Sequence, residues 1–363
     1  MQSNTHAHEY AELRQLLAQQ GLFDRQPMYY AGKALQNLSF LVLTVGILVT
    51  TNVFWVQMLN AAFLAFVFTQ IAFMGHDAGH RQMFQSAWKT DVFGLLCTLL
   101  TAISYSWWTE KHNQHHRHPN HLERDPDVRL RFLVFSAEQS GLTQGFRRAI
   151  VKHQAHLFFP MLLLQGFASR FLSIAFLLSK RARFPVIESL FIAVHFLIYL
   201  GSVGFLLGIW QGVAFMLVHQ TLFGLYMGST FAPNHKGMLV LKGDGTLDRL
   251  RQQVLTARNV RSHPLTDFWF GGLNYQIEHH LFPQMARNKL KAAQATVKVF
   301  CQAHAIPYCE TGIVQAYSEA LRYLHRVSAP LRLPEKNVAN EPRVRDQSGE
   351  WPVTSSDKRL SGR

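Results

Sequence analysis

The sequence LSFLVLTVGILVTTNVFWVQM (residues 38–58) is apolar almost throughout and carries no charge. It lies in a longer block, from Ala34 to His76, that contains no Asp, Glu, Lys or Arg, and a second such block runs from Ser189 to His235. A membrane core is crossed by about 20 apolar residues of helix, so each block is long enough for two spans and a tight turn. The predicted spans are residues 38–58, 61–80, 187–208 and 211–232.

The two predicted turns, near Asn60 and near Gln211, carry no Lys or Arg. Basic residues instead lie on the segments at the other side of the predicted membrane: Arg14, Arg25, Lys33, Arg81, Lys89, Lys111, Arg117, Lys180, Arg181 and Arg183. The positive-inside rule places those segments and both termini in the cytosol. We therefore predict an all-α integral membrane protein, with four transmembrane helices in two hairpins and a cytosolic helical cap.

The remaining stretches are shorter or interrupted. Residues 91–108 are apolar but short, which favours a shallow or re-entrant helix that does not cross. Residues 155–180 contain Pro160, Gly166 and Arg170 and predict an interfacial helix pair, with an extra span as the alternative. The predicted divisions are a cytosolic or interfacial segment (1–37), a membrane domain (38–325) and a disordered tail (326–363).

Composition narrows the class of partner. Charged residues make up 16% of the chain, against about 25% in a soluble domain. The net charge of +14 does not indicate nucleic-acid binding, because the basic residues flank the apolar blocks instead of forming a groove-sized patch interleaved with aromatics. They suit lipid head groups or an acidic electron carrier. Cys97, Cys301 and Cys309 form no CxxC pair, which indicates reduced thiols and cytosol-facing chemistry.

The spacing of the histidines indicates a metal site. His76 and His80 are four residues apart, and His112, His115 and His116 have offsets of zero, three and four, so on helices each set projects from one face. His279 and His280 repeat the second pattern, with Gln276 in the leading position. Imidazole suits Fe, Zn, Cu and Ni, and these seven histidines are more than one ion needs, so we predict two ions.

Each set by itself has a plainer interpretation, because a helical His pair is often a solvated surface. The three sets together, all on one side of the predicted membrane, favour metal binding or catalysis. His195 and His219 lie on adjacent predicted spans but at different depths. We interpret them as buried, hydrogen-bonded side chains and not as haem ligands.

Three sequence motifs resemble the histidine boxes of the membrane fatty acid desaturases: HDAGH (76–80), HNQHH (112–116) and GGLNYQIEHHLFP (271–283). The leading Gln within QIEHHLFP is similar to the third box of front-end and related acyl-lipid or acyl-CoA desaturases. The stretches HRHPNHLERDPD (116–127) and FAPNHKG (231–237) extend the resemblance, which covers residues 40–300 approximately.

The resemblance implies a set of ligands. In that family an Asn-His element after the last span supplies a further ligand, which here is His235, beside Asn234. The implied ligands are His76, His80, His112, His115, His116, His235, His279 and His280. Gln276 stands where many members have a ninth histidine, and it is either a ligand or a group behind one. The candidate acceptors that orient ligand rings are Asp77, Asp125, Asp127 and Glu278, with solvation or helix capping as the alternative.

The resemblance also implies an activity, an O₂-dependent oxidoreductase that places a cis double bond in the acyl chain of an acyl-lipid or acyl-CoA. Two iron ions are the expected cofactors, O₂ the co-substrate, and no catalytic residue beyond the metal ligands is expected. Trp107, Trp108, Phe231 and Tyr275 are candidates to line the acyl tunnel, although an interfacial aromatic belt is the simpler interpretation of the two tryptophans.

The electron donor is expected to be external, a ferredoxin or a cytochrome b5, because no HPGG haem motif is present and residues 1–37 are too short for a fused cytochrome b5 domain. A hydroxylase or ketolase on the same scaffold is the main alternative activity. A membrane metal-binding or transport protein is disfavoured because the boxes lie at helix ends and not at mid-membrane depth. A lipid-binding scaffold without catalysis is disfavoured because no box has lost its histidines.

Overall fold

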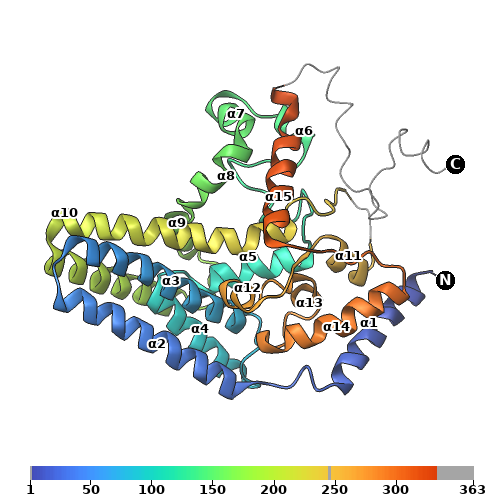
Figure 1. Cartoon of the computed structure of the whole chain (residues 1–363), viewed down its shortest axis with the longest axis horizontal. Coiled ribbons are helices and arrows are strands. Elements are labelled where there is room, and N and C mark those ends of the chain that lie inside the picture. The colour runs from blue at the N-terminus through green and yellow to red at the C-terminus, as the bar shows by residue number, and fades with distance from the viewer. Residues whose placement is uncertain (1, 244–246, 333–363) are drawn as a thin grey trace.

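The computed structural model describes residues 2–243 and 247–332, and its regular secondary structure is helical apart from one pair of very short strands (Figure 1). The helices of the first half are α1 (Gln2–Gln19), α2 (Pro27–Thr50), α3 (Phe54–Gly79), α4 (Ala87–Thr101), α5 (Tyr105–Arg117), α6 (Ala137–Gly141), α7 (Gly145–Lys152), α8 (Gln154–Leu162) and α9 (Gln165–Leu178). The second half contains α10 (Pro185–His235), α11 (Arg249–Leu255), α12 (Pro264–Trp269), α13 (Gln276–Leu281), α14 (Leu290–Ala303), α15 (Ile313–Val327), the 3₁₀ turns η1 (Arg287–Lys289) and η2 (Ala329–Leu331), and strands β1 (Asn259–Val260) and β2 (Glu310–Thr311), which pair in parallel.

The first hairpin joins α2 to α3, but its turn is not where the sequence predicts it. The chain reverses at residues 51–53, and the predicted turn near Asn60 is wrong. Asn60 is buried inside α3, where its side-chain amide donates to the carbonyl of Thr44 on α2 (3.0 Å). Gln57 donates to the carbonyls of Ile47 and Thr51 (3.0 and 2.6 Å). A polar residue that bonds the neighbouring helix can therefore lie within a span and needs no turn.

The second hairpin agrees with the sequence. α10 is interrupted at Gly208, whose φ of 72° and ψ of 176° are open to glycine but strained for other residues. Tyr199 lies 2.6 Å from His219 (Oη to Nδ1), and Val203 packs on Gly212, so the two arms of α10 are antiparallel. His195 Nδ1 bonds the carbonyl of Leu99 (3.0 Å), which confirms that both histidines are hydrogen-bonded inside the bundle.

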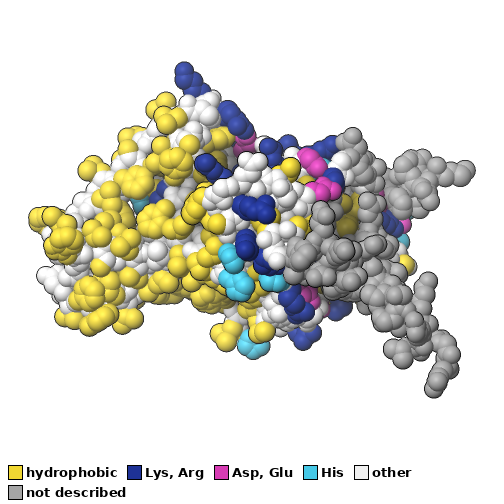
Figure 2. Space-filling model, turned by 90° about the horizontal axis from the view of Figure 1, so that it is seen from above, with side chains coloured by type: hydrophobic (Ala, Val, Ile, Leu, Met, Phe, Trp, Pro, Cys, Tyr) yellow, Lys and Arg dark blue, Asp and Glu magenta, His cyan; other side chains and the backbone are white. Residues whose placement is uncertain are grey.

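The long apolar helices and the hydrophobic side chains on the surface indicate a membrane protein. Among the described residues, α2, α3 and α10 are long and apolar enough to cross a membrane, and the bent pairs α4–α5 (110°) and α8–α9 (72°) would each add a span if counted as one. Hydrophobic side chains cover the end of the molecule that these long helices form, whereas Lys and Arg gather at the other end (Figure 2). An apolar exterior of this extent is typical of contact with lipid. The chain is an all-α membrane protein.

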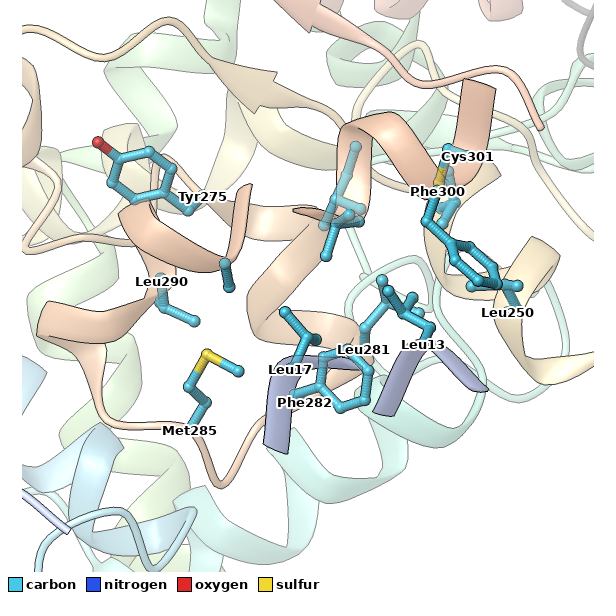
Figure 3. Close-up of a cluster of buried hydrophobic side chains, with 14 of the residues drawn as sticks. Leu13, Leu17, Leu250, Tyr275, Leu281, Phe282, Met285, Leu290, Phe300 and Cys301 are labelled. Atoms are coloured by element: carbon cyan, nitrogen blue, oxygen red, sulfur yellow. The ribbon is translucent and has the colours of Figure 1, made fainter. Parts of the chain in front are cut away.

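The end of the molecule away from the long apolar helices has its own hydrophobic core (Figure 3). Leu13 and Leu17 of α1 are fully buried against Leu281 and Phe282, which directly follow His280, and Tyr10 Oη donates to the carbonyl of Leu281 (2.9 Å). The predicted segment 1–37 is therefore divided between this core and α2, which begins at Pro27 with proline in the first turn, where its missing N–H is harmless.

The end of the described chain extends past the predicted domain boundary. Val327, Ser328 and Ala329 are buried at the end of α15 and in η2. The predicted boundary at residue 326 therefore falls inside folded chain. Residues 333–363 of the predicted disordered tail lie outside the described residues.

All three cysteines are buried and unpaired, as expected for reduced thiols. Burial, with a smaller contribution from Glu278, raises the pKa of Cys301 to about 12. At pH 8 its thiol is therefore protonated, and the thiolate is the reactive form. We expect iodoacetamide to modify Cys301 only after denaturation, as measured by peptide mass spectrometry. Rapid labelling of the native protein would contradict this placement.

Candidate metal centre

The histidine boxes meet where four helical segments converge. His76 is in the last turn of α3, and His80 caps it. Box two lies on α5, His235 ends α10, and the third box forms α13. Spacings of three and four residues put the imidazoles of each segment on one helical face. All eight predicted ligands are buried, each with at most 9% of its surface exposed.

The imidazoles fall into two adjacent groups. Donor nitrogens of one group lie within 4.8 Å of one another, and this group consists of His76, His80, His112 and His279. The second group, with the same spacing, consists of His115, His235 and His280.

His116 lies between the two groups. Its Nε2 is 3.0 Å from His112 Nε2, and its ring stacks on His280 with centroids 4.2 Å apart. In the second group, His115 Nε2 is 3.3 Å from His235 Nε2. The Nδ1 atoms of His115 and His235 face acceptors, Asp125 and the Thr256 carbonyl, so the single N–H of each neutral ring lies there and their facing Nε2 atoms suit a cation.

The donor atoms themselves fit a metal. The Nε2 atoms of His76, His80, His279 and His280 are buried and have no hydrogen-bond partner. A buried polar atom left without a partner costs about 1–3 kcal/mol, and a bound cation would remove this cost. Burial, followed by the neighbouring imidazoles, lowers the pKa of His279 and His280 well below the ordinary value, so both rings are neutral and can coordinate.

Two predicted carboxylates support ligand rings. Asp125 accepts from His115 Nδ1 (2.9 Å), and Asp77 from His76 Nδ1 (3.0 Å). A bond at Nδ1 fixes the tautomer that leaves Nε2 free for a metal. Asp127, 3.7 Å from His115 Nδ1, pairs mainly with Lys111. Burial would raise the pKa of Asp127, but Lys111 and then His115 outweigh it and hold that pKa below the usual range.

Two groups that support ligand rings were not predicted from the sequence. His280 Nδ1 bonds Gln253 Oε1 on α11 (3.0 Å), and His235 Nδ1 bonds the carbonyl of Thr256 (3.0 Å). A backbone carbonyl leaves no signature in a sequence. Gln253 is outside every box, so only the packing of α11 against α13 reveals its role.

An apolar cleft opens onto these histidines. Its volume is about 180 Å³, and it is lined by His112, His115 and His235 together with mainly apolar side chains. A smaller cavity of about 40 Å³ lies beside His76 and reaches Cys97 and Thr101. The two share the lining residues Ile103, Trp108, Met227 and Phe231. The two cavities are therefore adjacent, and both have predicted ligand histidines in their walls.

The cleft contains three of the four predicted tunnel residues. Trp107, Trp108 and Phe231 line it, and Trp108 stacks on the ring of His112 with centroids 4.4 Å apart. The prediction for Tyr275 is wrong. Its hydroxyl hydrogen-bonds Ser262 (2.8 Å) and Asp267 (2.9 Å), and Tyr275 does not line the cleft.

Comparison with known proteins identifies the family. The family model described as "Fatty acid desaturase" matches residues 53–312, which is most of the chain. The chain belongs to the fatty acid desaturase family. The resemblance stated from the histidine boxes is therefore confirmed.

Several relatives of this desaturase family member are curated proteins. It is 28% identical over 333 residues to the acyl-lipid (9-3)-desaturase of Physcomitrium patens, covering 88% of this chain and 62% of the moss protein. It is 28% identical over 349 residues to the Delta(8)-fatty-acid desaturase of Helianthus annuus (89% and 74% covered). It is 28% identical over 340 residues to the Delta(6)-fatty-acid desaturase fat-3 of Caenorhabditis elegans (88% and 74% covered). The chain thus spans less than two thirds of the moss protein's length.

Iron is the metal used in this family, and the buried imidazoles of this desaturase family member fit it. Nitrogen donors without partners, neutral rings and carboxylates behind them are the arrangement that a divalent iron ion needs.

Glu278 requires a correction. It was predicted to accept from a ligand ring, but its carboxyl accepts from Asn259 Nδ2 and Tyr308 Oη (2.7 Å each). Both ring nitrogens of His279 lack a hydrogen-bond partner, so Glu278 does not support that ring. Burial raises the pKa of Glu278 to about 7. In this desaturase family member Glu278 ties α13 to β1.

Gln276 and Asn234 do lie beside the ligands. Gln276 Nε2 is 3.0 Å from His235 Nε2, and its Oε1 accepts from Asn234 Nδ2 (3.2 Å). Asn234 Nδ2 also reaches the carbonyls of Thr230 (3.2 Å) and Leu273 (3.0 Å), and so joins α10 to the chain before α13.

Replacing Asp125 by asparagine is expected to weaken iron binding and activity about 10–100-fold. The carboxylate accepts from His115 Nδ1, Asn120 N (2.8 Å) and Asp127 N (2.8 Å), and an amide has only one oxygen for these donors. Iron per chain and turnover measure the effect, with Glu123→Gln, an exposed acid of the same loop, as control. Equal iron affinity in the two variants would contradict the assigned role.

Proposed function

We propose that this protein is an O₂-dependent desaturase that introduces a cis double bond into a fatty acyl chain carried by a lipid or by coenzyme A. The observation that carries the proposal is the opening of two groups of buried imidazoles onto an apolar cleft. Methylene groups are recognised by apolar surface and exclude water from it. The relatives are named fatty acid desaturases, which supports the same substrate class.

In this reaction the protein would hold the metal ions, orient the ligand rings, and keep the acyl chain in an apolar cleft from which water is excluded. The first group of histidines and the second would each hold one of two iron ions, which supply the oxygen chemistry when bound. Trp108, Met227 and Phe231 would hold the acyl methylenes beside the donor nitrogens. Asp125 and Asp77 keep the rings of His115 and His76 in one orientation.

A cytosolic metal centre on four spans is part of the proposal. The spans are α2, α3 and the two arms of α10. The reversals at residues 51–53 and at Gly208 carry no Lys or Arg, whereas Lys, Arg and His gather at the opposite end (Figure 2). The positive-inside rule supports a cytosolic location for that end. The net charge of +14 supports an external, acidic electron donor of the ferredoxin or cytochrome b5 type.

The proposal is tested by expressing the full chain in a host that lacks its own acyl desaturases. We expect acyl chains with new cis double bonds, identified by mass spectrometry, that are absent from a vector control and from cultures without oxygen. Hydroxy-acyl products would reassign the protein to the hydroxylases on this scaffold. Unchanged acyl chains in cells containing the iron-loaded protein would reject both activities.

A further inference from the structure

A third cavity lies beside the cleft. Its volume is about 270 Å³, and Arg129, Leu142 and Arg147 contribute to its lining. It shares Leu130 and Leu133 with the cleft that opens onto the histidines. The two spaces are therefore neighbours that share these two leucine side chains in their walls, and one elongated molecule could occupy both.

The two arginines of this cavity are not neutralised. Among residues 2–243 and 247–332, the guanidinium groups of Arg129 and Arg147 make no ion pair and no hydrogen bond. The Nε atom of Arg147 is buried without a partner. The carboxyl of Glu138, on the neighbouring helix α6, is already bound by Lys242 (2.6 Å).

The two lysines that line the cleft, by contrast, have partners within the protein. The ammonium of Lys111 pairs with the carboxylate of Asp127, and Lys236 Nζ donates to the backbone carbonyl of Asp127 (3.3 Å). Among the Lys and Arg side chains that line the two cavities, those without a protein partner are therefore Arg129 and Arg147 of the third cavity. Arg129 is exposed and Arg147 is half-buried, so a ligand from solvent can reach both cations, and an anion between them would relieve their mutual repulsion.

We propose that Arg129 and Arg147 bind a phosphate group on the polar head of the substrate, while the acyl chain runs past Leu130 and Leu133 into the cleft. The planar guanidinium matches phosphate oxygens in paired hydrogen bonds. The site rests on the proposed function, because it assigns a head group to the same acyl substrate. Phosphate is the chemistry shared by a glycerophospholipid and coenzyme A.

The test compares the full-length, iron-loaded protein with the double variant Arg129→Gln/Arg147→Gln. The matched control is Arg131→Gln/Arg148→Gln, because both arginines are exposed neighbours on the same two segments and neither lines the cavity. One acyl chain is supplied on phosphatidylcholine, on coenzyme A and on uncharged diacylglycerol. Charged hydrogen bonds of this kind correspond to about 10–100-fold in KM.

We expect the double variant to raise KM by that factor for the phosphate-bearing carrier that the enzyme uses, with kcat within about twofold and diacylglycerol unaffected. A shift confined to phosphatidylcholine assigns the site to a lipid head group, and one confined to acyl-CoA assigns it to coenzyme A. A KM equal to that of the control for both carriers overturns the proposal. An equal rise with diacylglycerol also overturns it.

A binding measurement separates this site from the activity. Calorimetric titration with dihexanoyl phosphatidic acid should saturate wild type and the control but not the double variant, and Arg129→Lys/Arg147→Lys should bind with intermediate affinity. Thermal unfolding checks that each variant is folded. If wild type makes no double bond, the proposed function fails while the titration still decides the phosphate site. Equal binding by the two Gln double variants would refute that site.

Discussion

Replacement of His112 by alanine is expected to abolish double-bond formation and to reduce bound iron. His112 belongs to the first donor group and also faces His116 Nε2 at 3.0 Å, so its loss affects the centre on both sides. Groups that merely support a ligand are worth about 10–100-fold in metal affinity, and loss of the ligand should exceed that range. The measurements are acyl-chain profiles by mass spectrometry and iron per chain by elemental analysis.

The control is His153→Ala, because His153 is an exposed histidine between α7 and α8, outside both donor groups. It should retain wild-type products and iron. His112→Ala protein that keeps both would show that the imidazoles are not the metal site. If iron falls but products persist, double-bond formation does not depend on this centre.

Replacement of Asp77 by alanine is expected to lower the free energy of unfolding by about 3–5 kcal/mol. Asp77 bonds His76 Nδ1 and also accepts from Arg287 Nε (2.6 Å), and both members of this ion pair are buried. Alanine would leave a buried guanidinium without its counter-charge, and that is more costly than the loss of the pair as a whole. Thermal or denaturant unfolding of the purified protein measures the change.

The double variant Asp77→Ala/Arg287→Met separates the two contributions. Removing both charges should restore part of the stability lost in Asp77→Ala, because no unpaired charge remains. Iron binding should stay impaired in the double variant, since the ring of His76 has lost its support. A double variant no more stable than Asp77→Ala would argue against the uncompensated charge as the cause.

Most of the proposed ligand set was predicted from local spacing in the sequence. Offsets of three and four residues place imidazoles on one helical face, and the charge-free blocks predict that those helix ends lie on one side of a membrane. His235 could be predicted only through the family resemblance, since a lone histidine has no spacing of its own. The structure places its nitrogen with those of His115 and His280.

What could not be predicted depends on contacts between distant segments. Asn60 resembles a turn residue until its partner on α2, the carbonyl of Thr44, is known. Glu278 is next to a ligand in the chain but faces Asn259 and Tyr308 in the fold. Gln253 supports His280 from a helix that no motif marks. Each outcome was decided by tertiary packing, which local patterns do not encode.

The hydrophobic core formed by α1 and the third box is expected to form late when the chain folds. Tyr10 bonds the backbone of Leu281, a contact that spans 271 residues, and Leu13 and Leu17 pack in the same cluster as Leu281. Contacts of such high separation in sequence form late, because a long loop must close first. The ribosome synthesises about 5–20 residues per second, so α13 is made long after α1. Until then, the leucines of α1 lack the residues against which they pack in the folded protein. Metal loading is therefore expected to be one of the last events in the biogenesis of this protein, after both membrane hairpins are in place.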